Sequence, residues 1–332
     1  MGTKNNTIEV MKSMTMILVV VAHVSKMYTE DGAIAVNGEN VILSNLTSFI
    51  YSFHMPVFFA LSGFVYYICK RELGKYKDNI MFVKNKALRL LVPCLFFLFL
   101  NVIPVLYAVD LLTNDVLHQM SLLEDLRHLW FLPTLFAISV LFNLFEEYIY
   151  RDYKKTVLIA LVLFFVSSFV PHVFQISNIL KYFVFYYIGY LFAYKKKIST
   201  PPNITNVVVV MAIWTLTTFF ILLFSNKQTY GLRSLMLIVS TLCGFYMLYC
   251  LSYLICKKGI DKSRCLVLFS KNSFGIYLFH PMFIYLMFYF LKPYNLNSWL
   301  LFVGITLIVL IISFYCTSLI RMCGLRMAIG EK

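Results

Sequence analysis

Ten apolar segments divide this chain, and each is close to the length of a helix that crosses a lipid bilayer. A membrane-spanning α-helix needs about 17 to 25 mostly apolar residues. The segments lie near residues 8–28, 46–69, 88–108, 129–150, 154–171, 176–194, 204–224, 231–256, 272–291 and 297–323. We therefore predict an all-α, polytopic integral membrane protein with ten transmembrane helices.

The composition supports this class of protein. Of the 332 residues, 61% are hydrophobic and 13% are charged, whereas a soluble domain is about half apolar and about a quarter charged. The linkers are too short to fold alone, so we expect one transmembrane domain over residues 1–332 and no separate soluble domain. Residues 33–35 resemble a signal-peptidase site, but they lie well beyond the first apolar run, which we expect to be retained.

The basic residues predict the orientation of the chain. The net charge of +14 comes from short Lys and Arg clusters between apolar segments, which is typical of topology signals and not of a nucleic-acid-binding surface. With the N-terminus inside, most Lys and Arg residues fall on the cytoplasmic side, while the two longest outer linkers are acidic. We expect both termini in the cytoplasm, a lipid bilayer of the bacterial cytoplasmic-membrane type around the helices, and no nucleic acid as a partner.

Lys12 and His23 share one face of the first segment. They are eleven residues apart, which in an α-helix is roughly three turns and about 16.5 Å of rise. Their side chains therefore point the same way at different depths. An ionisable His inside an apolar membrane segment costs free energy and marks a candidate functional site. The structural alternative is a packing His that is hydrogen-bonded to a neighbouring helix.

Two further histidines lie within apolar segments. His54 is about two turns in from the outer end of the second segment, so we expect it at the level of His23. His280 is near the middle of the ninth segment. A neutral imidazole can accept the proton of a hydroxyl group, so this part of the chain is a candidate site for proton transfer.

A basic pair opens the third segment on the predicted cytoplasmic side. Lys86 and Arg89 are three residues apart, and we expect them at the depth of Lys12. Such a cluster can bind phosphate groups through charge-assisted hydrogen bonds. The alternative is that these cations only anchor the helix on the cytoplasmic side.

Five motifs follow one another along the chain. They are Lys12 to His23, Ser52 to Phe59 with Ser62 to Phe64, Lys86 to Arg89 with Pro93, His128 to Pro133, and Ser273 to Pro281. In this order they resemble the membrane acyltransferases of the acyltransferase 3 group, over the whole chain, and most of all the branch with fucose 4-O-acetylase-like and intercellular-adhesin O-acyltransferase members. The family's basic pair is often Arg-x-x-Arg. Lys86 departs from it, because a Lys binds phosphate as a point charge without the bidentate fork.

The resemblance implies transfer of an acyl group, usually acetyl, from cytoplasmic acyl-CoA to a hydroxyl of a cell-surface or lipid-linked glycan. The family's catalytic His maps onto His23, and we expect His54 to orient His23 or the acceptor hydroxyl. The donor-binding cations map onto Lys12, Lys86 and Arg89. Acetyl-CoA or another acyl-CoA is then a substrate, and we predict no permanently bound cofactor and no metal.

Substrate-binding roles are expected for His128, Trp130 and His280. Trp130 suits an interfacial aromatic belt and stacking on a sugar equally well. His280 suits either a hydrogen bond across helices or the lining of the acyl path. For His23, general-base catalysis and an acyl-His intermediate both stay open, as does the choice between a monomer and a homo-oligomer.

Two other classes of protein share either the polytopic architecture or the acyl-transfer chemistry expected here. A polysaccharide exporter or flippase is also polytopic, but ion-coupled transport usually needs acidic residues inside the membrane. The 15 Asp and Glu residues lie in linkers or at segment ends, which favours the enzyme. A membrane-bound O-acyltransferase of another fold would do similar chemistry, and the order of the motifs argues against it.

Overall fold

A computed structural model describes residues 2–34, 40–195, 202–223, 230–294 and 296–331. Within these ranges every regular element is a helix, which confirms the all-α prediction. The contacts group the chain into two compact units, residues 1–58 with 198–319, and residues 59–197 with 320–332.

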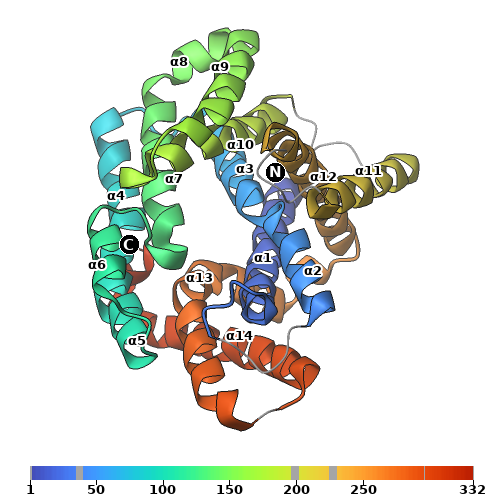
Figure 1. The fold of residues 1–332 in the computed structure, drawn as a ribbon. Helices are drawn as coiled ribbons and strands as arrows, with labels where there is room; N and C mark the ends of the chain where they lie inside the picture. The colour runs from blue at the N-terminus through green and yellow to red at the C-terminus, as the bar shows by residue number, and fades with distance from the viewer. Residues whose placement is uncertain (1, 35–39, 196–201, 224–229, 295, 332) are drawn as a thin grey trace. The chain divides into compact units, whose positions relative to one another are not determined.

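The first unit is built around α1. This helix packs against α2, α12 and α13, and α11 packs against α12 (Figure 1). The hydroxyl of Thr47 donates to Ser25 Oγ at 2.8 Å and joins α2 to α1. Its α-helices are α1 (Gly2–Ser25), α2 (Val41–Tyr51), α11 (Ile204–Leu223), α12 (Tyr230–Lys257), α13 (Arg264–Leu291) and α14 (Ser298–Met322).

The second unit is built around α7 and α10. Helix α7 packs against α4 and α10, and α10 packs against α9 (Figure 1). Its α-helices are α3 (His54–Tyr67), whose first residues belong to the first unit, α4 (Asn79–Phe97), α5 (Ile103–Ala108), α6 (Asn114–Ser121), α7 (Phe131–Leu144), α8 (Glu146–Arg151), α9 (Tyr153–Val166) and α10 (Ile176–Tyr194).

Two motif glycines allow helices to approach closely. A Cβ at Gly63 of α3 would lie 1.9 Å from the carbonyl oxygen of Tyr186 in α10. A Cβ at Gly275 of α13 would lie 2.2 Å from Thr317 Cγ2 in α14. Small residues bring membrane helices together in this way, so both glycines have a packing role in the fold.

Eight helical stretches are long and apolar enough to cross a membrane. They are Asn6–Tyr28, Val41–Glu72, Asn79–Ala108, Arg127–Leu144, Val173–Tyr194, Ser234–Lys257, Arg264–Tyr294 and Ser298–Met322. Of the other two predicted spans, the fifth corresponds to α9, which has 14 residues, and the seventh to the shorter apolar stretch Thr205–Phe220. A multi-pass membrane protein is thus established, while the count of ten and the cytoplasmic position of the termini remain predictions.

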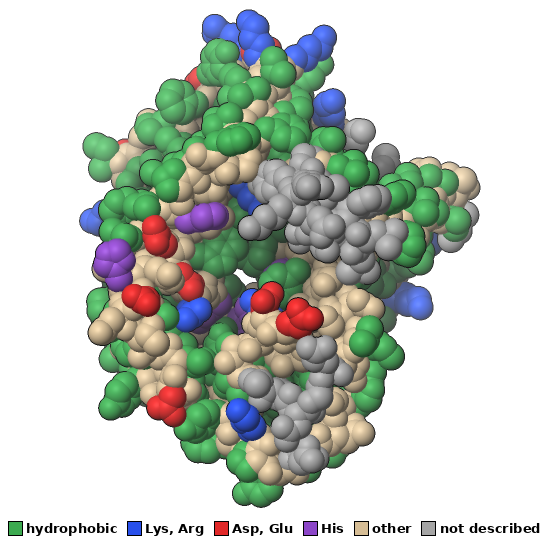
Figure 2. Space-filling model, viewed as in Figure 1, with side chains coloured by type: hydrophobic (Ala, Val, Ile, Leu, Met, Phe, Trp, Pro, Cys, Tyr) green, Lys and Arg blue, Asp and Glu red, His purple; other side chains and the backbone are tan. Residues whose placement is uncertain are grey.

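Helix α14 shows the surface expected of a lipid-facing helix. One face is buried and includes Leu301, Ile305 and Val309, at intervals of four residues. The other face is also apolar but exposed, with Val303, Leu307, Ile311, Tyr315 and Leu319 at the same interval. A helix that is apolar all round is typical of a membrane span. Hydrophobic side chains likewise cover much of the face drawn in Figure 2.

Two predicted spans differ in detail from the structure. The second is broken, because α2 ends at Tyr51 and α3 starts at His54 after a turn at Ser52 and Phe53. The third starts earlier than predicted, at Asn79, where the side chain of Asp78 accepts hydrogen bonds from the N–H groups of Ile80 and Met81 at 2.8 and 3.3 Å. This N-cap begins the helix within a polar stretch.

Candidate active site

His23 lies in the last turn of α1, on the same unbroken helix as Lys12, as predicted. Its imidazole is half-buried. Within the ranges that the structure describes, neither ring nitrogen of His23 has a hydrogen-bond partner. Two rings, those of Tyr51 and His280, lie against this imidazole.

The nearest of these rings is that of His280 in α13. The two ring centroids are 5.1 Å apart, and the planes meet at 65°. His280 is fully buried. The sequence placed His280 in the ninth apolar segment, which α13 contains, but did not pair it with His23.

Pro281 explains how His280 is held. A proline has no N–H, so the carbonyl of Tyr277, four residues earlier, lacks its helical partner. Nδ1 of His280 lies 2.8 Å from that carbonyl and 3.1 Å from the carbonyl of Ile276. Both of these carbonyls are on the same helix as His280. Since a carbonyl only accepts, Nδ1 carries the proton, and Nε2 keeps its lone pair when the ring is neutral.

His54 is held by the same kind of contact at the start of α3. Its Nδ1 lies 2.8 Å from the carbonyl of Ile50, at the end of α2, and its side chain is buried. The turn at Ser52 and Phe53 separates the two helices and brings His54 over that carbonyl. The same argument leaves Nε2 of His54 as the unprotonated nitrogen.

Tyr51 joins His23 to His54, a link that sequence reasoning missed. The Tyr51 ring centroid is 6.0 Å from that of His23 and 4.8 Å from that of His54. The ammonium of Lys26, just after α1, lies 5.6 Å from the centre of the Tyr51 ring. Tyr51 directly precedes the Ser52 motif, and Lys26 is three residues after His23, so both lay beside residues that the sequence had singled out.

The turn that carries His54 is itself fixed by polar and aromatic contacts. Ser52 Oγ lies 2.8 Å from Ser240 Oγ of α12, which also accepts from the indole N–H of Trp214 in α11 at 3.1 Å. Phe53 packs on the same indole, with centroids 4.8 Å apart. A Cβ at Gly244 would clash with Phe53 at 2.7 Å. These contacts make the break between α2 and α3 a defined part of the first unit.

The predicted donor-binding cations belong to both units. Lys12, in the first, forms an ion pair with Glu9 at 2.8 Å. Lys86 and Arg89, in the second, lie on α4 two to three turns after its start at Asn79, not at its first turn as predicted. Lys86 is half-buried and Arg89 is exposed. A joint site of all three remains a prediction.

The C-terminal residues lie against the helix that carries Arg89. The short helix Arg326–Ile329 packs on α4, with Ala328 and Ile329 buried. Glu331 accepts two hydrogen bonds from Arg321, at 2.6 and 2.8 Å. Arg321 is the main reason that the pKa of Glu331 is lowered, and Arg89 adds a smaller effect.

His128 and Trp130 lie in the second unit. His128 is buried in the short helix that precedes α7. Trp130 packs beside Tyr182 and Phe59, with centroids 5.1 and 6.2 Å apart. A substrate-binding role for either residue stays a prediction, and the two roles weighed for Trp130 remain open.

One buried ion pair of the second unit was not anticipated. Glu146 is 1% exposed and accepts two hydrogen bonds from Arg71, at 2.7 and 2.6 Å, and a third from the Tyr190 hydroxyl at 2.8 Å. The Arg71 guanidinium also lies 4.0 Å from the centre of the Tyr150 ring. Glu146 does lie at a segment end, as expected of the acidic residues, but it is not exposed there.

These features define a polytopic membrane protein that holds three imidazoles close to one another among apolar helices, an arrangement suited to moving protons. Comparison with protein families gives the class a name. A model described as an acyltransferase domain, Acyl_transf_3, matches residues 5–318, and the chain belongs to this family of membrane acyltransferases. Neither the comparison with curated proteins nor the comparison with solved structures gave a match.

Proposed function

We propose that the protein is a membrane O-acyltransferase that moves an acyl group, in the first instance acetyl, from cytoplasmic acyl-CoA to a hydroxyl of a cell-surface or lipid-linked glycan. Membership of the acyltransferase family supports the reaction class. The observation that carries the site assignment is the position of His23, half-buried, beside His280 and Tyr51.

In this proposal His23 is the base. A ring nitrogen of neutral His23 takes the proton of the acceptor hydroxyl as its oxygen attacks the thioester carbonyl, and the CoA thiolate leaves. His280, held by the Tyr277 carbonyl, limits the orientations open to the His23 ring. His54, held by the Ile50 carbonyl, does so through Tyr51. Such support from neighbouring side chains keeps a reacting group in a productive geometry.

The donor is proposed to enter from the cytoplasmic side. Lys12, Lys86 and Arg89 would neutralise its phosphates, while its thioester reaches along α1 toward His23. The rise of about 16.5 Å between Lys12 and His23 suits a long, extended donor such as acyl-CoA.

The experiment that tests this function compares glycans. Cell-surface and lipid-linked glycans from cells with and without the gene are analysed by mass spectrometry. We expect the loss of one acetyl mass per acceptor sugar when the gene is deleted, and its return with the wild-type gene but not with His23→Gln. Glycans that disappear from the surface with their acyl groups intact inside the cell would indicate an exporter instead.

A further inference from the structure

Tyr51 holds a hydroxyl group beside the proposed base. Its ring contacts those of His23 and His54, and its side chain is half-buried. Among the residues that the structure describes, none forms a hydrogen bond with the Tyr51 hydroxyl. The hydroxyl oxygen is also open to its surroundings, since it is not one of the enclosed side-chain atoms that lack a partner. Tyr51 therefore keeps a hydrogen-bond donor that a substrate can use.

Lys26 brings a positive charge to the same ring. Its ammonium lies 5.6 Å from the centre of the Tyr51 ring, and its side chain is half-buried. It follows His23 by three positions, just beyond the end of α1. The nearest acidic residues in the sequence, Glu30 and Asp31, are exposed, and in the described part of the chain no carboxylate forms an ion pair with Lys26. Its charge is therefore available to a bound group.

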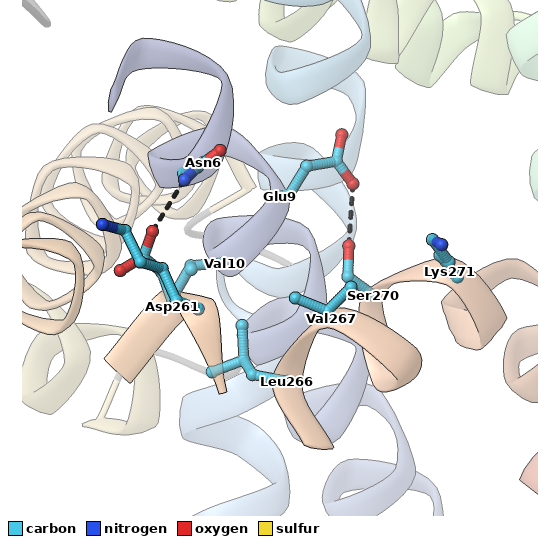
Figure 3. Close-up of a pocket in the computed structure, with 9 residues that line it drawn as sticks. Asn6, Glu9, Val10, Asp261, Leu266, Val267, Ser270 and Lys271 are labelled. Atoms are coloured by element: carbon cyan, nitrogen blue, oxygen red, sulfur yellow. Dashed lines mark hydrogen bonds between the residues drawn. The ribbon is translucent and has the colours of Figure 1, made fainter. Parts of the chain in front are cut away.

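The opposite end of α1 shows a different arrangement of charges. There Lys12 forms an ion pair with Glu9 at 2.8 Å. Glu9 also accepts a hydrogen bond from the hydroxyl of Ser270 in α13 at 2.8 Å (Figure 3). These contacts join the start of α1 to α13 and neutralise a cation, whereas Lys26 meets an aromatic ring instead of a carboxylate.

The other donors around His23 are already in use. His54 and His280 each direct the Nδ1–H group to a backbone carbonyl, at 2.8 Å in both cases. The hydroxyl of Ser25, two residues after His23, donates to a backbone carbonyl at 3.1 Å. In this group of side chains, the phenol and the ammonium are thus the donors that remain for a substrate.

The proposed reaction needs such donors close to the base. When a hydroxyl attacks a thioester, the carbonyl carbon becomes tetrahedral and its oxygen gains a negative charge. Fixed hydrogen-bond donors and positive charges stabilise this oxyanion, and they do so most strongly in an apolar site with little water. Because His23 takes the proton of the attacking hydroxyl, the oxyanion forms near the imidazole, where the phenol and the ammonium lie.

We infer that Tyr51 and Lys26 form an oxyanion hole next to His23. The inference rests on the proposed function. As the acceptor oxygen bonds to the thioester carbon, its proton passes to His23, and the π electrons of the carbonyl move onto its oxygen. This oxygen accepts a hydrogen bond from Tyr51 and lies near the charge of Lys26. When the C=O bond forms again, the C–S bond breaks, and the thiolate leaves with the electron pair and takes the proton from His23.

Tyr51→Phe removes the hydroxyl and keeps the ring between His23 and His54. We expect kcat for acetyl transfer to fall by about a hundredfold, the effect of losing one oxyanion donor, with unchanged affinity for acetyl-CoA. Transfer rates and calorimetry on purified full-length protein measure both. Tyr28→Phe is the matched control, because its hydroxyl donates elsewhere, to the carbonyl of Ser298 at 3.0 Å, and its kcat should stay near wild type.

Lys26→Met tests the charge. We expect kcat to fall by roughly tenfold to a hundredfold, as for the loss of one charge-assisted contact. Lys26→Arg keeps the charge and should retain most of the wild-type rate. Lys292→Met, at an exposed Lys just after α13, controls for the loss of a positive charge and should behave as wild type.

Two analogues of acetyl-CoA separate stabilisation of the oxyanion from positioning of His23. In both a methylene group replaces the thioester sulfur; one ends in a methyl ketone and the other in a trifluoromethyl ketone, which adds water and becomes tetrahedral. Wild type should bind the trifluoromethyl ketone at least about a hundredfold more tightly, as expected of a transition-state analogue, and Tyr51→Phe should lose most of that preference. The ratio of two ligands on one variant does not depend on how much of that variant folds.

The outcomes separate this inference from the proposed function. A near-wild-type kcat in Tyr51→Phe, or a lower kcat with an unchanged ratio of the two ketone affinities, overturns the oxyanion hole. Acetyl transfer by wild type that His23→Gln abolishes would in that case leave the proposed function standing. A wild-type protein that transfers no acyl group to any glycan would overturn the proposed function itself, and the oxyanion hole with it.

Discussion

His23 and His280 meet edge to face, with ring centroids 5.1 Å apart, although they are far apart in the sequence. The contact joins α1 to α13, two helices that pack along each other. Each His comes from a motif that was noted separately in the sequence. Their contact makes the orientation of His23 depend on how α13 holds His280, and that dependence can be tested at Pro281.

Pro281→Ala restores an N–H that competes with His280 for the carbonyl of Tyr277. We expect acetyl transfer to fall by roughly fivefold, because about 1 kcal/mol of hydrogen bonding that orients His280 is lost, while the affinity for acetyl-CoA stays unchanged. Transfer rates and calorimetry on the same preparation measure both. Pro293→Ala, beyond the end of α13, is the control. Equal rates for the two variants would show that Pro281 has no part in positioning the site.

His54 is expected to act on turnover. In His54→Gln the imidazole between the Ile50 carbonyl and Tyr51 is lost, so Tyr51 and His23 lose a fixed neighbour. We expect kcat to fall at least about tenfold with little change in donor affinity, since a misplaced catalytic group affects the chemical step. His118→Gln, at an exposed His of α6, should behave as wild type. A purely structural role would instead appear as a loss of folded protein at unchanged kcat.

The cations of α4 are predicted to bind donor phosphates. Lys86→Gln and Arg89→Gln should each weaken acetyl-CoA binding by roughly tenfold to a hundredfold, since a charge-assisted contact contributes about 1.5 to 3 kcal/mol. Added salt should weaken wild-type binding too. Lys77→Gln, in the exposed linker before α4, controls for the loss of one positive charge. Unchanged affinity in both α4 variants would mean that these residues serve only as membrane anchors.

The sequence predicted the helices well because hydrophobic length is a strong signal. It also placed Lys12 and His23 on one helix, since both lie on a single apolar run. It missed the break at Ser52 and Phe53, because the apolar segment continues through this turn and no polar stretch separates the two helices. It placed Lys86 and Arg89 too close to the helix start, because hydropathy marks the apolar stretch and not the N-cap at Asp78.

The contacts between side chains of different helices could not be predicted from the sequence, for a different reason. Helical periodicity says which residues share a face of one helix, but not which faces of two helices meet. His280 and Tyr51 reach His23 only through the packing of α13 and α2 on α1. The burial of Glu146 likewise depends on Arg71, 75 residues earlier in the chain, and on Tyr190 of α10.

The Glu146–Arg71 pair is expected to stabilise the second unit. Glu146→Ala leaves the Arg71 guanidinium without its buried partner, so we expect a loss of about 3 kcal/mol in the free energy of unfolding. Glu147→Ala is the matched control, because Glu147 lies 3.4 Å from the same guanidinium but is 86% exposed, and it should cost less than about 1 kcal/mol. Thermal unfolding of the purified variants compares them. Equal midpoints for both variants would show that the buried pair adds no stability.

If His23 removes the proton of the acceptor hydroxyl, replacing it must slow acetyl transfer, and the rate of transfer by His23→Gln measures this effect. The measurement uses purified protein, radiolabelled acetyl-CoA and the glycan acceptor found by mass spectrometry. General-base catalysis contributes about a hundredfold to ten-thousandfold, so we expect a fall of at least about a hundredfold in kcat, with acetyl-CoA affinity and thermal midpoint close to wild type. A His23→Gln enzyme that transfers acetyl groups at near the wild-type rate would show that His23 is not the base.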